Sequence, residues 1–128
     1  MIIGVGIDAC EVSRVRRLLG RHPERFLARC YTDVEVAYAH RFADPSERLA
    51  ARFAGKEAVM KSLGSGWRRL RWRDIEIPGG GRPTVNVYGT AAARAERLGV
   101  TGFHISLTHT GDLALAYVIA EGPGTPST

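Results

Sequence analysis

The sequence predicts a single α+β domain in which a mainly antiparallel sheet packs against one long helix and several short ones. Strand-like segments occupy both ends of the chain, at 1–12, 103–110 and 113–121, and a tight turn joins the last two. The longest helical pattern, at 44–64, lies between them with clear start and stop signals. We expect residues 1–121 to form the domain and 122–128 a disordered tail.

The first half of the chain reads as one strand followed by helices. After the strand, Ser13 is the predicted N-cap of a short helix with apolar residues on one side and arginines on the other. Another short helix begins at Pro23, which suits a first helical turn. Thr32 and Glu35 have the spacing of a capping box, so a third helix begins there.

The longest helix is predicted to run from an N-cap at Asp44 to Gly64, which lies just past its end. On a helical wheel its apolar stripe consists of Leu49, Phe53, Met60 and Leu63. Lys56 falls within this stripe, and Glu57 and Lys61 lie on its shoulder. A surface ion pair between Glu57 and Lys61, one turn apart, is one interpretation, but it does not account for Lys56.

The second half changes to the periodicity of strands. Segments 72–78 and 83–88 flank a glycine-rich turn and predict a hairpin, and a short helix ending at Gly99 follows. The last strand, 113–121, is apolar on both faces. We therefore expect a helix to cover one of its faces and another subunit the other.

The composition predicts a cytoplasmic protein with an anionic ligand or an acidic partner. The net charge is +5, and the 18 basic residues include only two lysines, Lys56 and Lys61. Arginine binds phosphates and carboxylates better than lysine does, because its planar guanidinium group can donate two hydrogen bonds to them at once. We expect no membrane partner, since no apolar run approaches the roughly 20 residues of a membrane span, and no signal peptide. Two cysteines without C-x-x-C spacing indicate neither a disulfide framework nor a zinc site.

Arginines cluster at 14–21 and again at 68–73. Both clusters are open to interpretation as solvated basic faces or as binding surfaces. No nucleic-acid-binding motif accompanies them, so we expect no nucleic-acid partner. A basic module that binds RNA or DNA through these arginines stays the alternative function from another class.

Asp8 lies in the stretch GVGIDAC, which matches the dinucleotide fingerprint only loosely, without a full strand before it or a helix directly after. It either turns the chain or serves a site. In strand 103–110, His109 lies on the apolar face and His104 on the other, so the two cannot share a metal. His109 is either a core residue or part of a site at the sheet edge. Together, two carboxylates and two lysines suit Mg²⁺ and phosphoryl-type transfer.

Three segments resemble the 4′-phosphopantetheinyl transferases, and within them the short bacterial holo-(acyl-carrier-protein) synthases. They are IIGVGIDACEVSRV (2–15), ARFAGKEAVMKSLGSG (51–66) and HISLTHTGDLALAYV (104–118). Gly55 stands where the family usually has alanine. The resemblance implies that phosphopantetheine passes from coenzyme A to a serine of apo acyl carrier protein, releasing adenosine 3′,5′-bisphosphate. A catalytically silent member of the family is a further alternative.

The resemblance also implies roles for single residues. Asp8 and Glu57 look like ligands of Mg²⁺ or Mn²⁺ at the catalytic centre, with Glu57 as the base and Lys61 acting on the leaving phosphate. The residues implied at the coenzyme are Arg52, Lys56, Lys61, Gly64, Pro83, Asn86 and His109. Arg14 and Arg21 would dock the carrier protein. A trimer is implied, with active sites at subunit boundaries, Asp8 and His109 coming from one chain and Glu57 with Lys61 from its neighbour.

Overall fold

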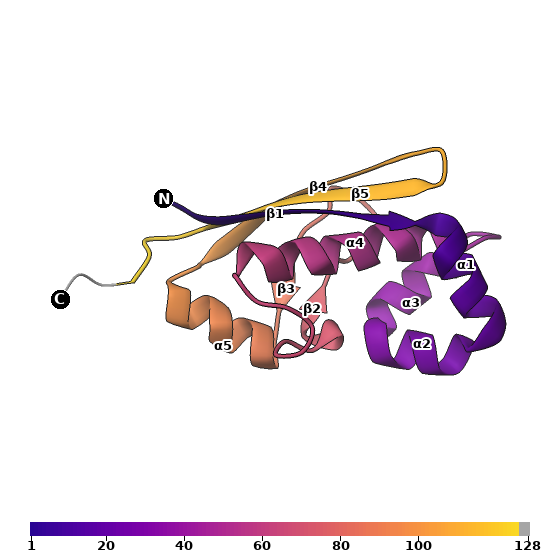
Figure 1. The fold of residues 1–128 in the computed structure, drawn as a ribbon, viewed down its shortest axis with the longest axis horizontal. Coiled ribbons are helices and arrows are strands. Elements are labelled where there is room, and N and C mark those ends of the chain that lie inside the picture. The colour runs from indigo at the N-terminus through magenta and orange to yellow at the C-terminus, as the bar shows by residue number, and fades with distance from the viewer. Residues whose placement is uncertain (126–128) are drawn as a thin grey trace.

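The computed structural model describes residues 1–125 and confirms the α+β class (Figure 1). Its elements in chain order are β1 (Ile2–Glu11), α1 (Val12–Arg21), α2 (Pro23–Cys30), α3 (Asp33–Ala39), α4 (Ser46–Ser62), the 3₁₀ turn η1 (Trp72–Asp74), β2 (Ile75–Glu76), β3 (Asn86–Val87), α5 (Gly89–Leu98), β4 (Gly102–Thr110) and β5 (Leu113–Glu121). Figure 1 shows α4 running beneath the main sheet, with α1 to α3 at one end and α5 at the other.

The main sheet has three antiparallel strands in the order β1-β5-β4. The register pairs Asp8 with Ala116 and His109 with Ala114, so both side chains lie on the sheet face that covers α4. The predicted hairpin is present but pairs only two residues on each side, Ile75 with Val87 and Glu76 with Asn86. This second sheet lies on the other side of α4 (Figure 1).

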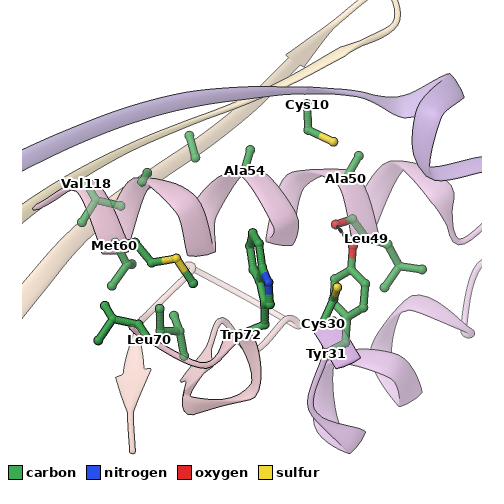
Figure 2. Close-up of a cluster of buried hydrophobic side chains, with 14 of the residues drawn as sticks. Cys10, Cys30, Tyr31, Leu49, Ala50, Ala54, Met60, Leu70, Trp72 and Val118 are labelled. Carbon is green, nitrogen blue, oxygen red and sulfur yellow. Dashed lines mark hydrogen bonds between the residues drawn. The ribbon is translucent and has the colours of Figure 1, made fainter. Parts of the chain in front are cut away.

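Glycine and alanine let β1 and α4 pack backbone against backbone. A Cβ on Gly4 or Gly6 would collide with the carbonyl oxygens of Ser62 and Ala58 in α4. Ala50 and Ala54 of α4 are fully buried on the same side of the helix, toward Cys10 of β1 (Figure 2). The two glycines of GVGIDAC therefore serve this close approach.

The opposite side of α4 carries the larger core side chains. Figure 2 shows Leu49, Met60, Leu70, Trp72 and Tyr31 gathered there. All are at most 8% exposed. The helix is thus covered on two sides, by the sheet and by the segments that surround it from below.

Two predicted helix starts are wrong by one or two residues. The N-cap of α1 is Glu11, and Ser13 lies inside the helix, because Asp112 of the β4–β5 turn accepts a hydrogen bond from the Ser13 backbone N–H at 2.9 Å. The N-cap of α4 is Pro45, although Asp44 Oδ1 still accepts from the Ser46 N–H at 3.0 Å. The capping box of Thr32 and Glu35 is confirmed.

Within the described part of the predicted tail, residues 122–125, backbone hydrogen bonds link the chain to other segments of the domain. Gly122 N–H donates to the Met1 carbonyl at 3.1 Å, and Gly124 N–H donates to the Gly99 carbonyl at 3.2 Å. Residues 126–128 of the expected tail lie outside the described residues. Gly99 ends α5 in the left-handed conformation, as predicted.

The face of the sheet away from α4 is apolar and open in the single chain. Val5, Ile7, Leu113 and Tyr117 are 53%, 60%, 40% and 44% exposed there. The alternate residues of β5, from Ala114 to Ala120, are buried against α4. Within residues 1–125, no helix combines the length and the apolar character that crossing a bilayer requires.

Candidate active site

Asp8, Glu57 and Lys61 come together where β1 lies on α4. Glu57 and Lys61 are one turn apart on the helix, and Asp8 projects from the strand toward them. Lys61 Nζ lies 3.2 Å from Asp8 Oδ1 and donates a hydrogen bond to the Ile7 carbonyl at 3.0 Å. All three residues belong to one chain, so the expected division of Asp8 from Glu57 and Lys61 between neighbouring chains is wrong. The glycine-mediated contact of β1 with α4 brings them together within one subunit.

The two carboxylates interact strongly. Burial, together with the hydrogen bond and negative charge of Asp8, raises the pKa of Glu57 to about 7, against the opposing charges of Lys61 and Arg14. A carboxyl group with this pKa near a second carboxylate holds a proton that a cation can replace. The pair supplies the hard oxygen donors that Mg²⁺ prefers, so these residues fit a divalent cation.

A cavity of about 390 Å³ opens beside Glu57. We call it the Glu57 cavity. Its apolar wall includes Phe26, Phe53 and Trp72, and the last two rings stack with centroids 4.5 Å apart. Its arginines are Arg14, Arg25 and Arg29, and His22 also lines it.

Of these three arginines, only Arg14 is predicted from the sequence to lie at a partner site. Arg25 and Arg29 are one turn apart on α2, and that spacing was the available signal. Arg21, the last residue of α1, is exposed but does not border the cavity. The helical pattern predicts Phe53 in the core stripe, whereas its side chain is only half-buried and forms part of the cavity wall.

A second cavity, of about 200 Å³, contains His109 and Arg52. His109 Nε2 lies 3.3 Å from Glu47 Oε1, and its side chain is 57% exposed, so it is not a core histidine. Arg52 is buried, donates to the carbonyls of Ile77 and Pro78 at 3.1 and 3.3 Å, and lies over the Tyr38 ring. This cavity shares no lining residue with the Glu57 cavity.

The remaining predicted coenzyme residues are dispersed. Asn86 is exposed on β3 and donates to Glu76 Oε1 at 3.4 Å, and Pro83 precedes it in the loop. Neither borders the two cavities above. Gly64 follows α4 with φ +65° and borders a different cavity beside α5.

Lys56 does not lie where the prediction of a phosphate contact requires. Its side chain is fully buried, and Nζ lies 2.6 Å from Glu35 Oε1. The same ammonium donates to the carbonyls of Trp72 at 3.0 Å and Ile75 at 2.6 Å. Three acceptors thus use its three protons, and we correct its role from coenzyme binding to structure.

Glu35 completes this buried cluster. Its Oε1 also accepts from the Thr32 N–H, and its Oε2 accepts from the Ile77 N–H, both at 2.8 Å. One side chain therefore caps α3, fixes the start of the segment after β2 and neutralises Lys56. This explains the lysine within the apolar stripe of α4.

A sheet packed on one long helix, with two carboxylates and a lysine beside an arginine-lined cavity, defines a site for phosphate ester chemistry. The family model of the 4′-phosphopantetheinyl transferase superfamily matches residues 4–118. The holo-[acyl-carrier-protein] synthase of Solibacter usitatus (strain Ellin6076) is 48% identical over 124 residues, which cover 94% of this chain and 99% of that protein. The chain belongs to the 4′-phosphopantetheinyl transferase superfamily.

Solved structures agree with this assignment. The crystal structure of holo-[acyl-carrier-protein] synthase from Neisseria meningitidis has a TM-score of 0.85 and 31% identity, covering 94% of this chain and 99% of that one. A holo-(acyl-carrier-protein) synthase from Bacillus anthracis str. Ames, in complex with CoA (3′,5′-ADP), has a TM-score of 0.78 and 29% identity, covering 95% and 98%. The fold of this chain is therefore the fold of those enzymes.

Proposed function

We propose that Asp8, Glu57 and Lys61 form the centre at which this chain transfers the 4′-phosphopantetheine group of coenzyme A to a serine of apo acyl carrier protein in the cytoplasm. The observation that carries the proposal is the single-chain cluster itself: an ammonium 3.2 Å from Asp8, beside a carboxyl with a pKa of about 7. The named relatives, and the neighbour in complex with CoA, support this substrate pair.

The chemistry asks for one proton acceptor and one source of positive charge. The serine oxygen forms a bond to the phosphorus that carries pantetheine, and the bond from this phosphorus to the bridging oxygen breaks. Glu57 is the proposed acceptor of the serine proton, since in the metal-free pair its pKa of about 7 leaves a large fraction of the carboxylate ionised at neutral pH. Lys61, half-exposed beside Asp8, neutralises the charge that develops on the leaving adenosine 3′,5′-bisphosphate.

Asp8 and Glu57 would hold Mg²⁺, with Mn²⁺ as the alternative. The metal, when bound, supplies further neutralisation of the pyrophosphate oxygens. Replacement of the Glu57 proton by a cation also removes the unfavourable interaction between the carboxylates. Within residues 1–125 no third aspartate, glutamate, histidine or cysteine joins this pair, so its other ligands would be water and phosphate oxygens.

The Glu57 cavity is the proposed approach of the carrier protein. Arg14, Arg25 and Arg29 border it, and Arg21 extends the basic surface along α1. An acidic partner would be steered here by charge, and its binding would weaken with salt. The apolar wall of Phe26, Phe53 and Trp72 suits the largely uncharged pantetheine arm.

A trimer with active sites at its subunit boundaries is the proposed assembly. Two observations support it: the apolar sheet face with Ile7 and Tyr117 is open in one chain, and the His109 cavity is separate from the Glu57 cavity. In this assembly His109 and Arg52 of one chain would contact coenzyme A bound at Asp8, Glu57 and Lys61 of the next. Gly64, Pro83 and Asn86 stay proposed coenzyme contacts.

Release of adenosine 3′,5′-bisphosphate from coenzyme A, followed by chromatography, tests the roles. Glu57→Gln and Lys61→Met should each lower kcat by about 100-fold or more, the range of a lost acid–base or charge-stabilising group. The matched control Asp33→Asn removes a fully exposed carboxylate and should change kcat less than about twofold. Retention of wild-type kcat in either catalytic variant would contradict the assigned role.

A further inference from the structure

A cavity of about 490 Å³ lies between the end of α4, the loop that follows it and the helix α5. Four arginines border it: Arg68 and Arg69 from the loop, and Arg94 and Arg97 from α5. No aspartate or glutamate lines it. Among residues 1–125 none of the four arginines forms an ion pair. Four positive charges thus surround one hollow without a countercharge.

Neutralisation of the α4 C-terminus explains only one of these arginines. Arg94 Nε donates to the Leu63 carbonyl at 2.9 Å, a favourable contact at a helix C-terminus. Within the described chain, Arg68, Arg69 and Arg97 donate no side-chain hydrogen bond. Their convergence on the cavity needs another reason.

The hydrogen bond to Leu63 also preorganises Arg94. Its Nη2 lies 3.5 Å from the position that a Cβ on Gly64 would take. The guanidinium group of Arg94 therefore extends over Gly64, and its two terminal nitrogens are available to bind an anion. A preorganised guanidinium loses less entropy on binding a phosphate than a mobile one does.

We propose that this arginine cavity binds a small anion with two or more phosphate groups. Its volume lies in the range of small-molecule sites, roughly 300 to 1,000 Å³. Guanidinium forks bind phosphate oxygens two at a time, and four of them match a chain of phosphates. The four arginines gather around one hollow, which favours such a compact ligand over a strand of nucleic acid or an acidic protein surface.

The site is distinct from the transfer centre. Asp8, Glu57 and Lys61 do not border the arginine cavity, which shares only Trp67 with the Glu57 cavity. Gly64, a proposed coenzyme contact, does line the arginine cavity, so competition with coenzyme A is the test of whether the four arginines bind a separate ligand. Trp67 is 51% exposed, and Arg68 lies 5.5 Å from its ring centroid. The indole offers an aromatic surface at the mouth, so a nucleotide with several phosphates would gain a stacking contact.

Inorganic tripolyphosphate is the probe that tests this proposal, by isothermal titration calorimetry on wild-type protein freed of metal. The test variant is Arg69→Gln/Arg97→Gln, whose two side chains are exposed and hold no other element. The control, Arg16→Gln/Arg17→Gln, removes the same number of arginines from α1, one of which, Arg16, is paired with Asp44. We expect the Kd to rise about tenfold or more in the test variant and less than about twofold in the control.

Three results would overturn the proposal. One is the absence of tripolyphosphate binding to wild type, or an equal Kd in the test variant. Another is loss of this binding when coenzyme A saturates the protein, which would assign the cavity to the coenzyme site. The last is binding of a single-stranded RNA oligonucleotide without binding of tripolyphosphate. Binding of the probe within about twofold in saturating coenzyme A supports a separate site, whatever the transfer assay shows.

Discussion

Replacement of Lys56 by methionine tests whether this lysine of α4 has a structural role and not a catalytic one. The change keeps an unbranched side chain and removes the ammonium. It leaves the Glu35 carboxylate buried without its cation, and the carbonyls of Trp72 and Ile75 without their donor. Removal of one partner of a buried ion pair costs about 3–5 kcal/mol, because the other charge stays uncompensated. For a chain of this size the midpoint of thermal unfolding should fall by about 10–20 °C.

Urea unfolding followed by tryptophan fluorescence measures this loss at a fixed protein concentration. The matched control is Lys61→Met, because the Lys61 side chain is 53% exposed and its ion pair should contribute less than about 1 kcal/mol. Transfer activity should show the opposite order, with Lys61→Met inactive and folded Lys56→Met retaining its KM for coenzyme A. A Lys56→Met variant of wild-type stability with a raised KM for coenzyme A would refute the structural role.

Four further predictions concern the site and its supports. In the metal-free protein the pKa of Glu57 rises from 4.5 to about 7, so the stability that this group contributes is present below pH 4.5 and is lost as the pH rises through 7. The full pKa shift corresponds to about 3 kcal/mol, which solvent exposure reduces. The free energy of unfolding of Glu57→Gln, measured with urea, should therefore be about 1–2 kcal/mol higher than that of wild type at pH 8 and equal to it at pH 4.5. The same difference at both pH values would contradict this prediction. Gly6→Ala should lower the free energy of unfolding by at least about 1–3 kcal/mol and reduce transfer activity, since the new Cβ would collide with the Ala58 carbonyl. In the control Gly20→Ala the new Cβ meets open space, so the protein should not be destabilised. Arg14→Gln should raise the KM for carrier protein several-fold at low salt, leaving that for coenzyme A unchanged; an equal rise in both would remove Arg14 from the docking surface. Tyr117→Glu should give monomers in sedimentation velocity, and an unchanged trimer would place the interface elsewhere.

The sequence predicts well those features that depend on near neighbours. Alternation in the terminal strands, the capping box at Thr32 and the glycine ends of α4 and α5 all depend on residues within a few positions. The pairing of the last two strands follows from their tight turn. These local signals were enough for the α+β class and for the face on which His109 lies.

Contacts between distant segments account for what the sequence did not predict. Lys56 within the apolar stripe was a visible anomaly, but nothing near it in the sequence names Glu35, which belongs to another helix and already served a capping box. A helical wheel shows that a charged residue lies on the apolar side of α4, but it does not show which residues pack against that side. The role of Lys56 can therefore be identified only when the fold shows that Glu35 lies beside it.

The candidate site shows the same division. Asp8, Glu57 and Lys61 were recognisable as residue types, yet their membership of one chain depends on how closely β1 approaches α4. The arginine cavity joins the loop after α4 to α5, and the wall of the Glu57 cavity joins α2 to η1. Neither grouping has a sequence signature, because no periodicity connects separate elements.

The most direct test of the transfer centre is the intact mass of an apo acyl carrier protein after incubation with coenzyme A, Mg²⁺ and this protein. We expect the carrier to gain one phosphopantetheine unit with wild type, and no gain with Asp8→Ala or with excess chelator. Absence of any gain with folded wild type, across several carrier proteins, would contradict the proposed transfer. A full gain with Asp8→Ala would contradict the role of the carboxylate pair.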